Sequence, residues 1–162
     1  MTKKISRKQR IIAKRRLRPL RRHVGDWRSV DFHVHSPTSR DFERPDEDRS
    51  YFWLLERADK AQLDVIVITD HNSVGGYKKL SELRTQLDYT KMVMERLNKT
   101  IDTDIQHQIE LFSKIVVLPG VELDIKPNLH MLVIFDPSMT TDDMDDFVAS
   151  AGYPISRRDD NC

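Results

Sequence analysis

Apolar residues in this 162-residue chain form continuous runs in some stretches and follow helical spacing in others. Residues 65–68 read Val-Ile-Val-Ile, and residues 115–118 repeat the pattern with Ile-Val-Val-Leu. Strands that are apolar on both faces are typical of a parallel sheet with helices covering each side. Pro119 is expected to end the ladder of its strand, because proline has no N–H to donate. The pattern predicts four strands, at residues 27–35, 64–69, 114–118 and 129–135.

Between these strands, apolar residues recur at intervals of three and four, which indicates helices. A first helix is expected at 50–62, and the long polar stretch 75–112 is expected to form two helices divided near 100–104. A last, acidic helix is expected at 141–149. This alternation of strands and helices predicts an α/β fold.

The length and composition limit the fold and the class of protein. A chain of 162 residues fits one domain, whereas a complete (β/α) barrel takes about 200 residues or more. No apolar run approaches the roughly 18 residues of a membrane-spanning helix. No signal peptide is indicated, and the single cysteine, Cys162, excludes a disulfide framework. We therefore expect a cytoplasmic protein without membrane contact.

The net charge of +1 conceals a strong division along the chain. Residues 1–23 hold eleven of the 27 Lys and Arg and no acid, so the remainder has 16 basic and 26 acidic side chains, a net charge of −10. Such a block is typical of a solvated arm, but it could also contact nucleic acid through the phosphates. We expect a basic arm at 1–23, a domain at 24–150 and a tail at 151–162.

The first candidate site is the pair His33 and His35. Side chains of a strand alternate between its faces, so these two imidazoles point the same way. Two imidazoles on a strand end supply half of a tetrahedral shell for zinc or a similar ion. The alternative is that both are ordinary polar residues on a sheet face.

Four further residues are candidates because they lie at strand ends or in the loops behind them. Asp41 lies in a loop after the first strand and could instead cap a turn, and His71 follows a buried strand but could be an ordinary loop histidine. Glu122 follows the third strand, and its two oxygens could bridge two cations. His130 begins the fourth strand. Ligands in parallel α/β folds gather at such ends. No function is expected of His107.

Four ordered segments resemble motifs of the polymerase and histidinol phosphatase (PHP) superfamily: 31–36, 68–72, 119–122 and 129–132. The resemblance implies a distorted (β/α)7 barrel with two or three divalent ions, commonly zinc, manganese or iron, that hydrolyses phosphoesters. By similarity, His33 and His35 would hold a first ion, and Glu122 would bridge it to a second ion that His130 also binds.

His71 and Asp41 would hold a third ion by the same similarity, with Asp70 and Asn72 orienting His71. Other members close the barrel with later strands that carry another His and an Asp-x-His pair, and no such residues follow Phe135. The expected fold is therefore a partial, truncated barrel of the PHP type.

The expected function is metal-dependent hydrolysis of phosphoesters, in nucleotides or nucleic acid among other substrates. An inactive truncated module that binds nucleic acid or protein is one alternative. Another is the front part of a longer protein that continues into an ATPase region, since the loop His-Ser-Pro-Thr-Ser-Arg-Asp at 35–41 resembles PHP domains of that group. Histidines bind metal only when neutral, so activity should fall below about pH 6.

Overall fold

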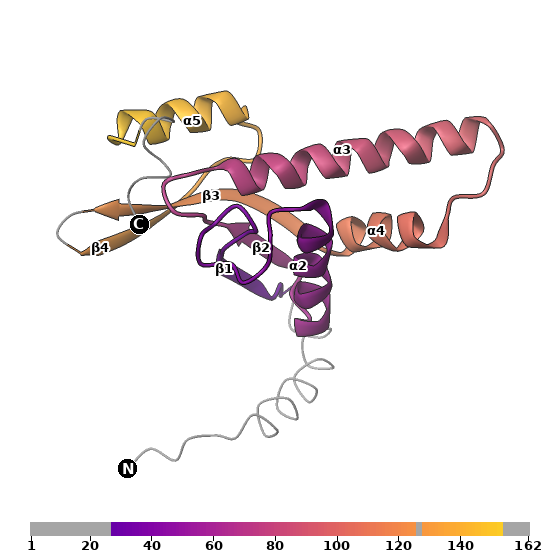
Figure 1. The fold of residues 1–162 in the computed structure, drawn as a ribbon, viewed down its shortest axis with the longest axis horizontal. Helices are drawn as coiled ribbons and strands as arrows, with labels where there is room; N and C mark the ends of the chain where they lie inside the picture. Colours follow the sequence, from indigo (N-terminus) through magenta and orange to yellow (C-terminus); the bar gives the residue numbers. More distant parts are fainter. Residues whose placement is uncertain (1–26, 126–127, 154–162) are drawn as a thin grey trace, which may run out of the picture.

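The computed structural model describes residues 27–125 and 128–153. The expected arm at 1–23 and residues 154–162 of the expected tail lie outside these ranges. The described residues form a mixed α/β structure around a curled, half-barrel sheet (Figure 1). Its elements are β1 (Val30–Val34), α2 (Asp48–Ala61), β2 (Val65–Ile68), α3 (Gly75–Arg96), α4 (Thr103–Lys114), β3 (Val116–Ile125), β4 (Leu129–Ile134) and α5 (Thr141–Ser150).

The four strands lie in the order β1-β2-β3-β4. The first three are parallel, as the apolar runs predict, whereas β4 runs antiparallel to β3. Strand β3 changes partner along its length, because it pairs with β2 up to Pro119 and with β4 from Gly120 onward. The prediction that Pro119 ends the ladder holds for the pairing with β2, but the strand itself continues to Ile125. Proline lacks only the N–H, and its carbonyl here accepts the N–H of Phe135 at 3.0 Å.

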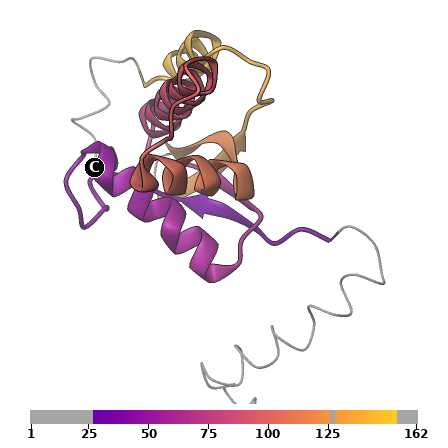
Figure 2. The same cartoon turned by 90° about the vertical axis from the view of Figure 1, so that its right-hand side faces the viewer.

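One core lies between the sheet and helices α2, α3 and α4 (Figure 2). Ile66 and Ile68 of β2 pack in this core with apolar side chains of all three helices. The expectation of helices on both faces is wrong for part of the described sheet. Phe32 of β1 and Val116 of β3 are 53% and 52% exposed, so helices do not cover them. The curled sheet is therefore partly open to solvent in the described part of the chain.

A second core lies under α5, which packs on the β3–β4 hairpin (Figure 1). Val121 and Leu123 of β3 are buried there beside Met144 and Val148 of the helix. The helix starts where the Thr140 side chain accepts the N–H of Asp143 at 3.1 Å, which satisfies a donor that the first turn leaves free. This packing fixes the second half of β3, where Glu122 lies.

A buried polar contact ties the loop after β1 to the segment between β2 and α3. One oxygen of Asp70 accepts the backbone N–H of Ser36 at 2.6 Å, and the other accepts its hydroxyl at 2.7 Å. Asp70 is buried, and this burial raises the pKa of its carboxyl. Gly76 of α3 lies directly against both side chains. No helix of the described residues has the length and apolarity needed to cross a membrane.

We predict that Gly76→Ala strongly destabilises the protein. A Cβ at this position would lie 1.9 Å from Ser36 Oγ and 2.2 Å from Asp70 Oδ2, so the buried contact would have to open. The loss in free energy of unfolding should be about 1–3 kcal/mol or more, measured by urea denaturation. Gly75→Ala is the matched control, because its Cβ would meet nothing closer than 3.2 Å. Equal stability losses in the two variants would contradict this account.

Candidate metal centre

The carboxylate of Glu122 meets the two imidazoles of the His-x-His segment. Its Oε2 lies 2.8 Å from His33 Nε2 and 2.9 Å from His35 Nε2. The two Nε2 atoms are themselves 3.2 Å apart. The alternation of side chains predicted that these imidazoles share a face, and the structure brings both to one carboxylate oxygen.

Two more histidines approach the same carboxylate from neighbouring segments. His130 of β4 places Nδ1 2.5 Å from Glu122 Oε1, and His71 places Nε2 3.7 Å from Oε2. The backbone sets this spacing, since His71 is the parallel bridge partner of Glu122. The N–H of Asn72 donates to the Glu122 carbonyl at 2.8 Å, and the N–H of Glu122 donates to that of Asp70 at 3.1 Å.

His71 lies between two carboxylates. Its Nε2 is 3.0 Å from Asp41 Oδ2, and its Nδ1 is 3.0 Å from Asp124 Oδ1. Asp41 also approaches His35, with Oδ2 3.7 Å from Nδ1. The sequence analysis missed Asp124. The signal was available, because Asp124 follows Glu122 by two residues and therefore shares its face of the strand.

The residues expected to orient His71 have other contacts. Within the described residues, the Asp70 side chain forms hydrogen bonds with Ser36 and not with His71. Asn72 contacts Asp124 instead, donating from Nδ2 to Oδ2 at 2.8 Å. Asp124 is thus the direct partner of the His71 ring at Nδ1, and Asn72 contacts Asp124 rather than the ring.

The donor atoms fit a divalent transition metal. Imidazole nitrogens combined with carboxylate oxygens are ligands that zinc, iron and manganese accept. In each of three groups, the ligand atoms lie within 4.8 Å of one another. The first and third groups share no residue, so two ions could be held by six different side chains. The groups are His33, His35 and Glu122; His35, Asp41 and His71; and His71, Asp124 and His130.

Ionised carboxylates place negative charge beside the imidazoles. Glu122 is only 2% exposed, and this burial would raise its pKa, but hydrogen bonds from His35, His33 and His130 outweigh it and lower the pKa to about 2. Burial would lower the pKa of His71, yet the hydrogen bond and charge of Asp124 raise it overall. The ionised Glu122 carboxylate therefore lies among imidazoles. A bound cation could take the place of the protons that these imidazoles share with it.

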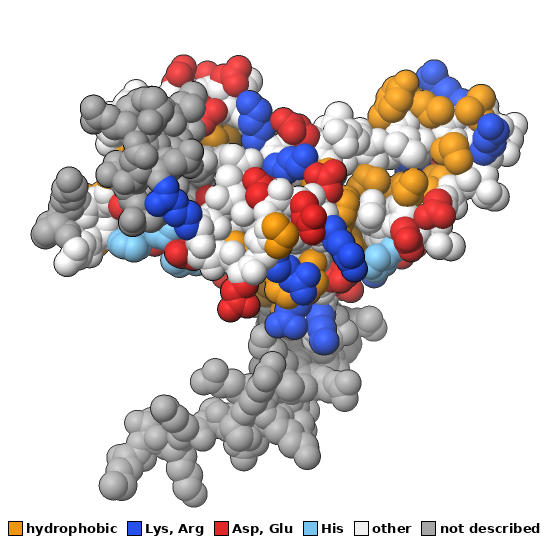
Figure 3. Space-filling model, in the orientation of Figure 1, with side chains coloured by type: hydrophobic (Ala, Val, Ile, Leu, Met, Phe, Trp, Pro, Cys, Tyr) orange, Lys and Arg blue, Asp and Glu red, His pale blue; other side chains and the backbone are white. Residues whose placement is uncertain are grey.

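The centre is accessible from outside the protein. The side chains of His33 and His130 are 49% and 56% exposed. Imidazoles reach the surface beside β4 in the space-filling view (Figure 3). In the described part of the chain, Glu122, Asp41 and Asp124 form ion pairs with histidines and with no Lys or Arg. A solute could thus reach ions held here.

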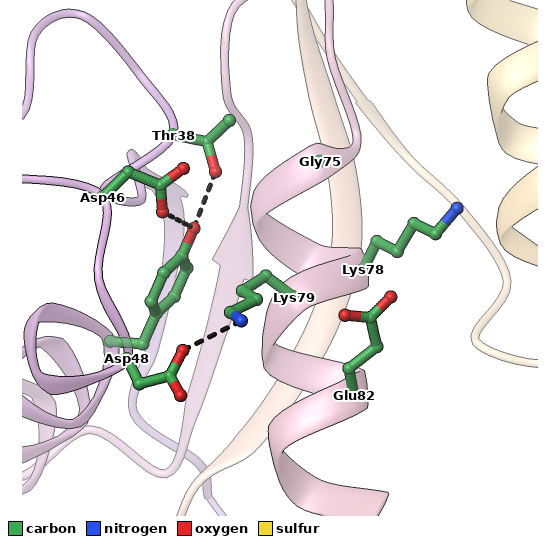
Figure 4. Close-up of a pocket in the computed structure, with 8 residues that line it drawn as sticks. Thr38, Asp46, Asp48, Gly75, Lys78, Lys79 and Glu82 are labelled. Atoms are coloured by element: carbon green, nitrogen blue, oxygen red, sulfur yellow. Dashed lines mark hydrogen bonds and ion pairs between the residues drawn. The ribbon is translucent and has the colours of Figure 1, made fainter.

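A hollow of about 350 Å³ lies between the loop after β1 and helices α2 and α3 (Figure 4). The Tyr51 hydroxyl donates to Asp46 at 2.7 Å and lies 2.7 Å from Thr38 Oγ1. Lys79 pairs with Asp48 at 2.8 Å across the same hollow. No imidazole lines it. The two contacts of Tyr51 hold the loop that carries Asp41 against α2, and the Lys79–Asp48 pair joins α2 to α3.

No protein-family model matches the chain, and no curated protein matches it. Among solved structures, it is similar to a crystal structure of a proposed metal-dependent phosphoesterase from Bifidobacterium adolescentis, at 20% sequence identity and a TM-score of 0.40. The match covers 76% of this chain and 31% of that protein, so the chain spans about a third of its length. A similarity at this level assigns neither a family nor a function.

We predict that Glu122 and His71 together contribute most to the stability of the metal-free protein between about pH 4.5 and 6.5. The lowered pKa of Glu122 contributes stability that is present above its ordinary value of 4.5 and is lost as the pH falls through about 2. The raised pKa of His71 contributes stability that is complete below its ordinary value of 6.5 and is lost as the pH rises through the raised value. Urea midpoints of chelator-treated protein across this range measure the effect. A midpoint that rises steadily above pH 6.5 would contradict it.

Proposed function

We propose that this chain forms a metal-dependent phosphoesterase centre of the PHP type. The observation that carries the proposal is the buried carboxylate of Glu122, in contact with imidazoles of His33, His35 and His130. A buried carboxylate with several imidazole partners matches the chemistry of a bridging metal ligand. The four ordered sequence motifs that resemble the PHP superfamily also support it.

His33, His35 and Glu122 would hold one ion, and Glu122 with His130 would hold a second. Asp41 and His71 would hold a third, because their ligand atoms lie 3.0 Å apart. Divalent ions bound in such a centre supply an activated water near neutral pH and neutralise charge on a phosphoryl group. Zinc, manganese and iron all suit this donor set.

The residues of the chain itself contribute position and charge. Glu122 stays ionised because its imidazole partners lower its pKa, so it offers both oxygens at neutral pH. The backbone bridge between His71 and Glu122 fixes two ligand-bearing segments side by side. The exposed edges of His33 and His130 leave the centre open to a phosphoester from solution.

A module that binds metal without hydrolysis is the second candidate. The observation that favours it is the sharing of residues between the three groups, since His35 and His71 each belong to two of them. An imidazole normally gives one nitrogen to one ion. The described residues can therefore fill two complete groups at the same time, but not three.

We predict that Glu122→Gln removes the bound metal and the phosphoesterase activity. Glutamine keeps the shape of the side chain but loses the charge that faces three imidazoles. Metal content by mass spectrometry should fall to well under one ion per chain, and the hydrolysis of p-nitrophenyl phosphate should fall at least about 100-fold. A chelator should have the same effect on the unmodified protein.

Glu95→Gln is the matched control for that variant, because Glu95 is exposed on α3. It should retain both metal and activity, and the circular dichroism of both variants should match that of the parent. Metal binding without any hydrolysis in the parent would favour the second candidate. Undiminished metal content in Glu122→Gln would refute both.

The contact of residues 1–23 with nucleic acid stays a prediction, since these residues lie outside the described ranges. Each Lys or Arg near a phosphate releases counterions, so binding through this segment should weaken steeply with salt. Deletion of 1–23 should remove salt-dependent DNA or RNA binding in a titration, while hydrolysis of a small phosphoester persists. Equal nucleic-acid affinity with and without the segment would show that it has no such role.

A further inference from the structure

Asp124 is held by three hydrogen bonds that leave its side chain little freedom. Its Oδ2 accepts from Asn72 Nδ2 at 2.8 Å, and its own N–H donates to Asn72 Oδ1 at 3.0 Å. The remaining oxygen, Oδ1, lies 3.0 Å from His71 Nδ1. The two sides of the Asn72 amide thus clamp Asp124 and leave one oxygen aimed at the imidazole.

Asn72 is itself fixed to β3. It is fully buried and has a φ of 50°, in the left-handed region that asparagine tolerates better than most residues. Its N–H donates to the carbonyl of Glu122 at 2.8 Å. Three hydrogen bonds therefore join Asn72 to Glu122 and Asp124, and the turn that carries His71 cannot shift along the strand without breaking them.

The carboxylate on the other side of His71 is held less firmly. The side chain of Asp41 is 63% exposed, whereas that of Asp124 is 26% exposed. Asp41 faces Nε2 and Asp124 faces Nδ1. A neutral imidazole has one N–H, and a fixed acceptor orients it better than an acceptor on an exposed loop. The proton of neutral His71 therefore belongs on Nδ1.

We propose that Asp124 is a positioning residue which, together with Asn72, holds His71 as the Nδ1–H tautomer and leaves Nε2 free for a metal ion. Nε2 faces the space shared with Asp41 and His35, whose ring centroid lies 4.8 Å from that of His71. A carboxylate behind a histidine ligand commonly fixes the ring in this way. The metal-binding part of this inference rests on the proposed function, whereas the tautomer does not.

The competing arrangement makes Asp124 a ligand. Its Oδ1 is also 3.7 Å from His130 Nε2, so His71, Asp124 and His130 could enclose an ion through Nδ1 of His71. The two arrangements require opposite tautomers of the neutral ring. The nitrogen that carries the proton therefore distinguishes them.

The test is the ¹⁵N chemical shift of the His71 ring in metal-free protein, followed with rising pH until the ring is neutral. We expect Nδ1–H in the parent chain and in Asp41→Ala, and a shift toward Nε2–H in Asp124→Ala. Asn72→Gly, which keeps the backbone conformation but removes the clamp, should give a mixture. Nε2–H in the parent, or an unchanged tautomer in Asp124→Ala, would overturn the proposal.

Zinc titration supplies the second readout. Asp124→Ala should bind the same number of ions as the parent, with at least one affinity weakened about 10–100-fold. Loss of one ion per chain would make Asp124 a ligand and overturn its positioning role. If the parent binds none of zinc, manganese and iron, the proposed function fails, but the tautomer measurement still decides the role of Asp124.

Discussion

The contact between the Glu122 carboxylate and its surrounding imidazoles is the interaction on which the arrangement of the strand ends depends. A carboxylate that is 2% exposed loses most of its hydration, at an effective cost of several kcal/mol. His33, His35 and His130 lie within 2.9 Å of it and compensate for that loss. Since the three imidazoles come from β1, the loop after it and β4, one buried charge draws together segments nearly a hundred residues apart.

The sequence predicted most of the elements of the fold. The Val-Ile-Val-Ile run of β2 indicated a buried parallel strand, which the structure confirms, and helical spacing predicted both α3 and α4. The exposure of Phe32 and Val116 could not be predicted, because it depends on which helices reach which face. Pro119 correctly marked the end of the pairing with β2 but misled about the end of the strand, because the loss of one N–H matters only where the ladder needs a donor.

For the centre, strand periodicity was the most useful signal. It predicted that His33 and His35 share one face, and the strand-end rule predicted that His71 and Glu122 both lie at the site. The same periodicity applied to Glu122 would have found Asp124. The partners of Asp70 and Asn72 could not be predicted from local sequence patterns, because each residue is held by one more than thirty positions away.

The register of β3 limits which insertions and deletions this protein can tolerate. Glu122 lies opposite His71 on one side, and Asp124 lies opposite His130 on the other, so both acids depend on the same count of residues from Pro119. Substituting one of these two acids changes one candidate metal ligand and leaves the other in place. Removing or adding a single residue in this stretch would turn both acids to the opposite surface of the sheet at once. The length of this strand is thus under a stricter constraint than any one of its side chains.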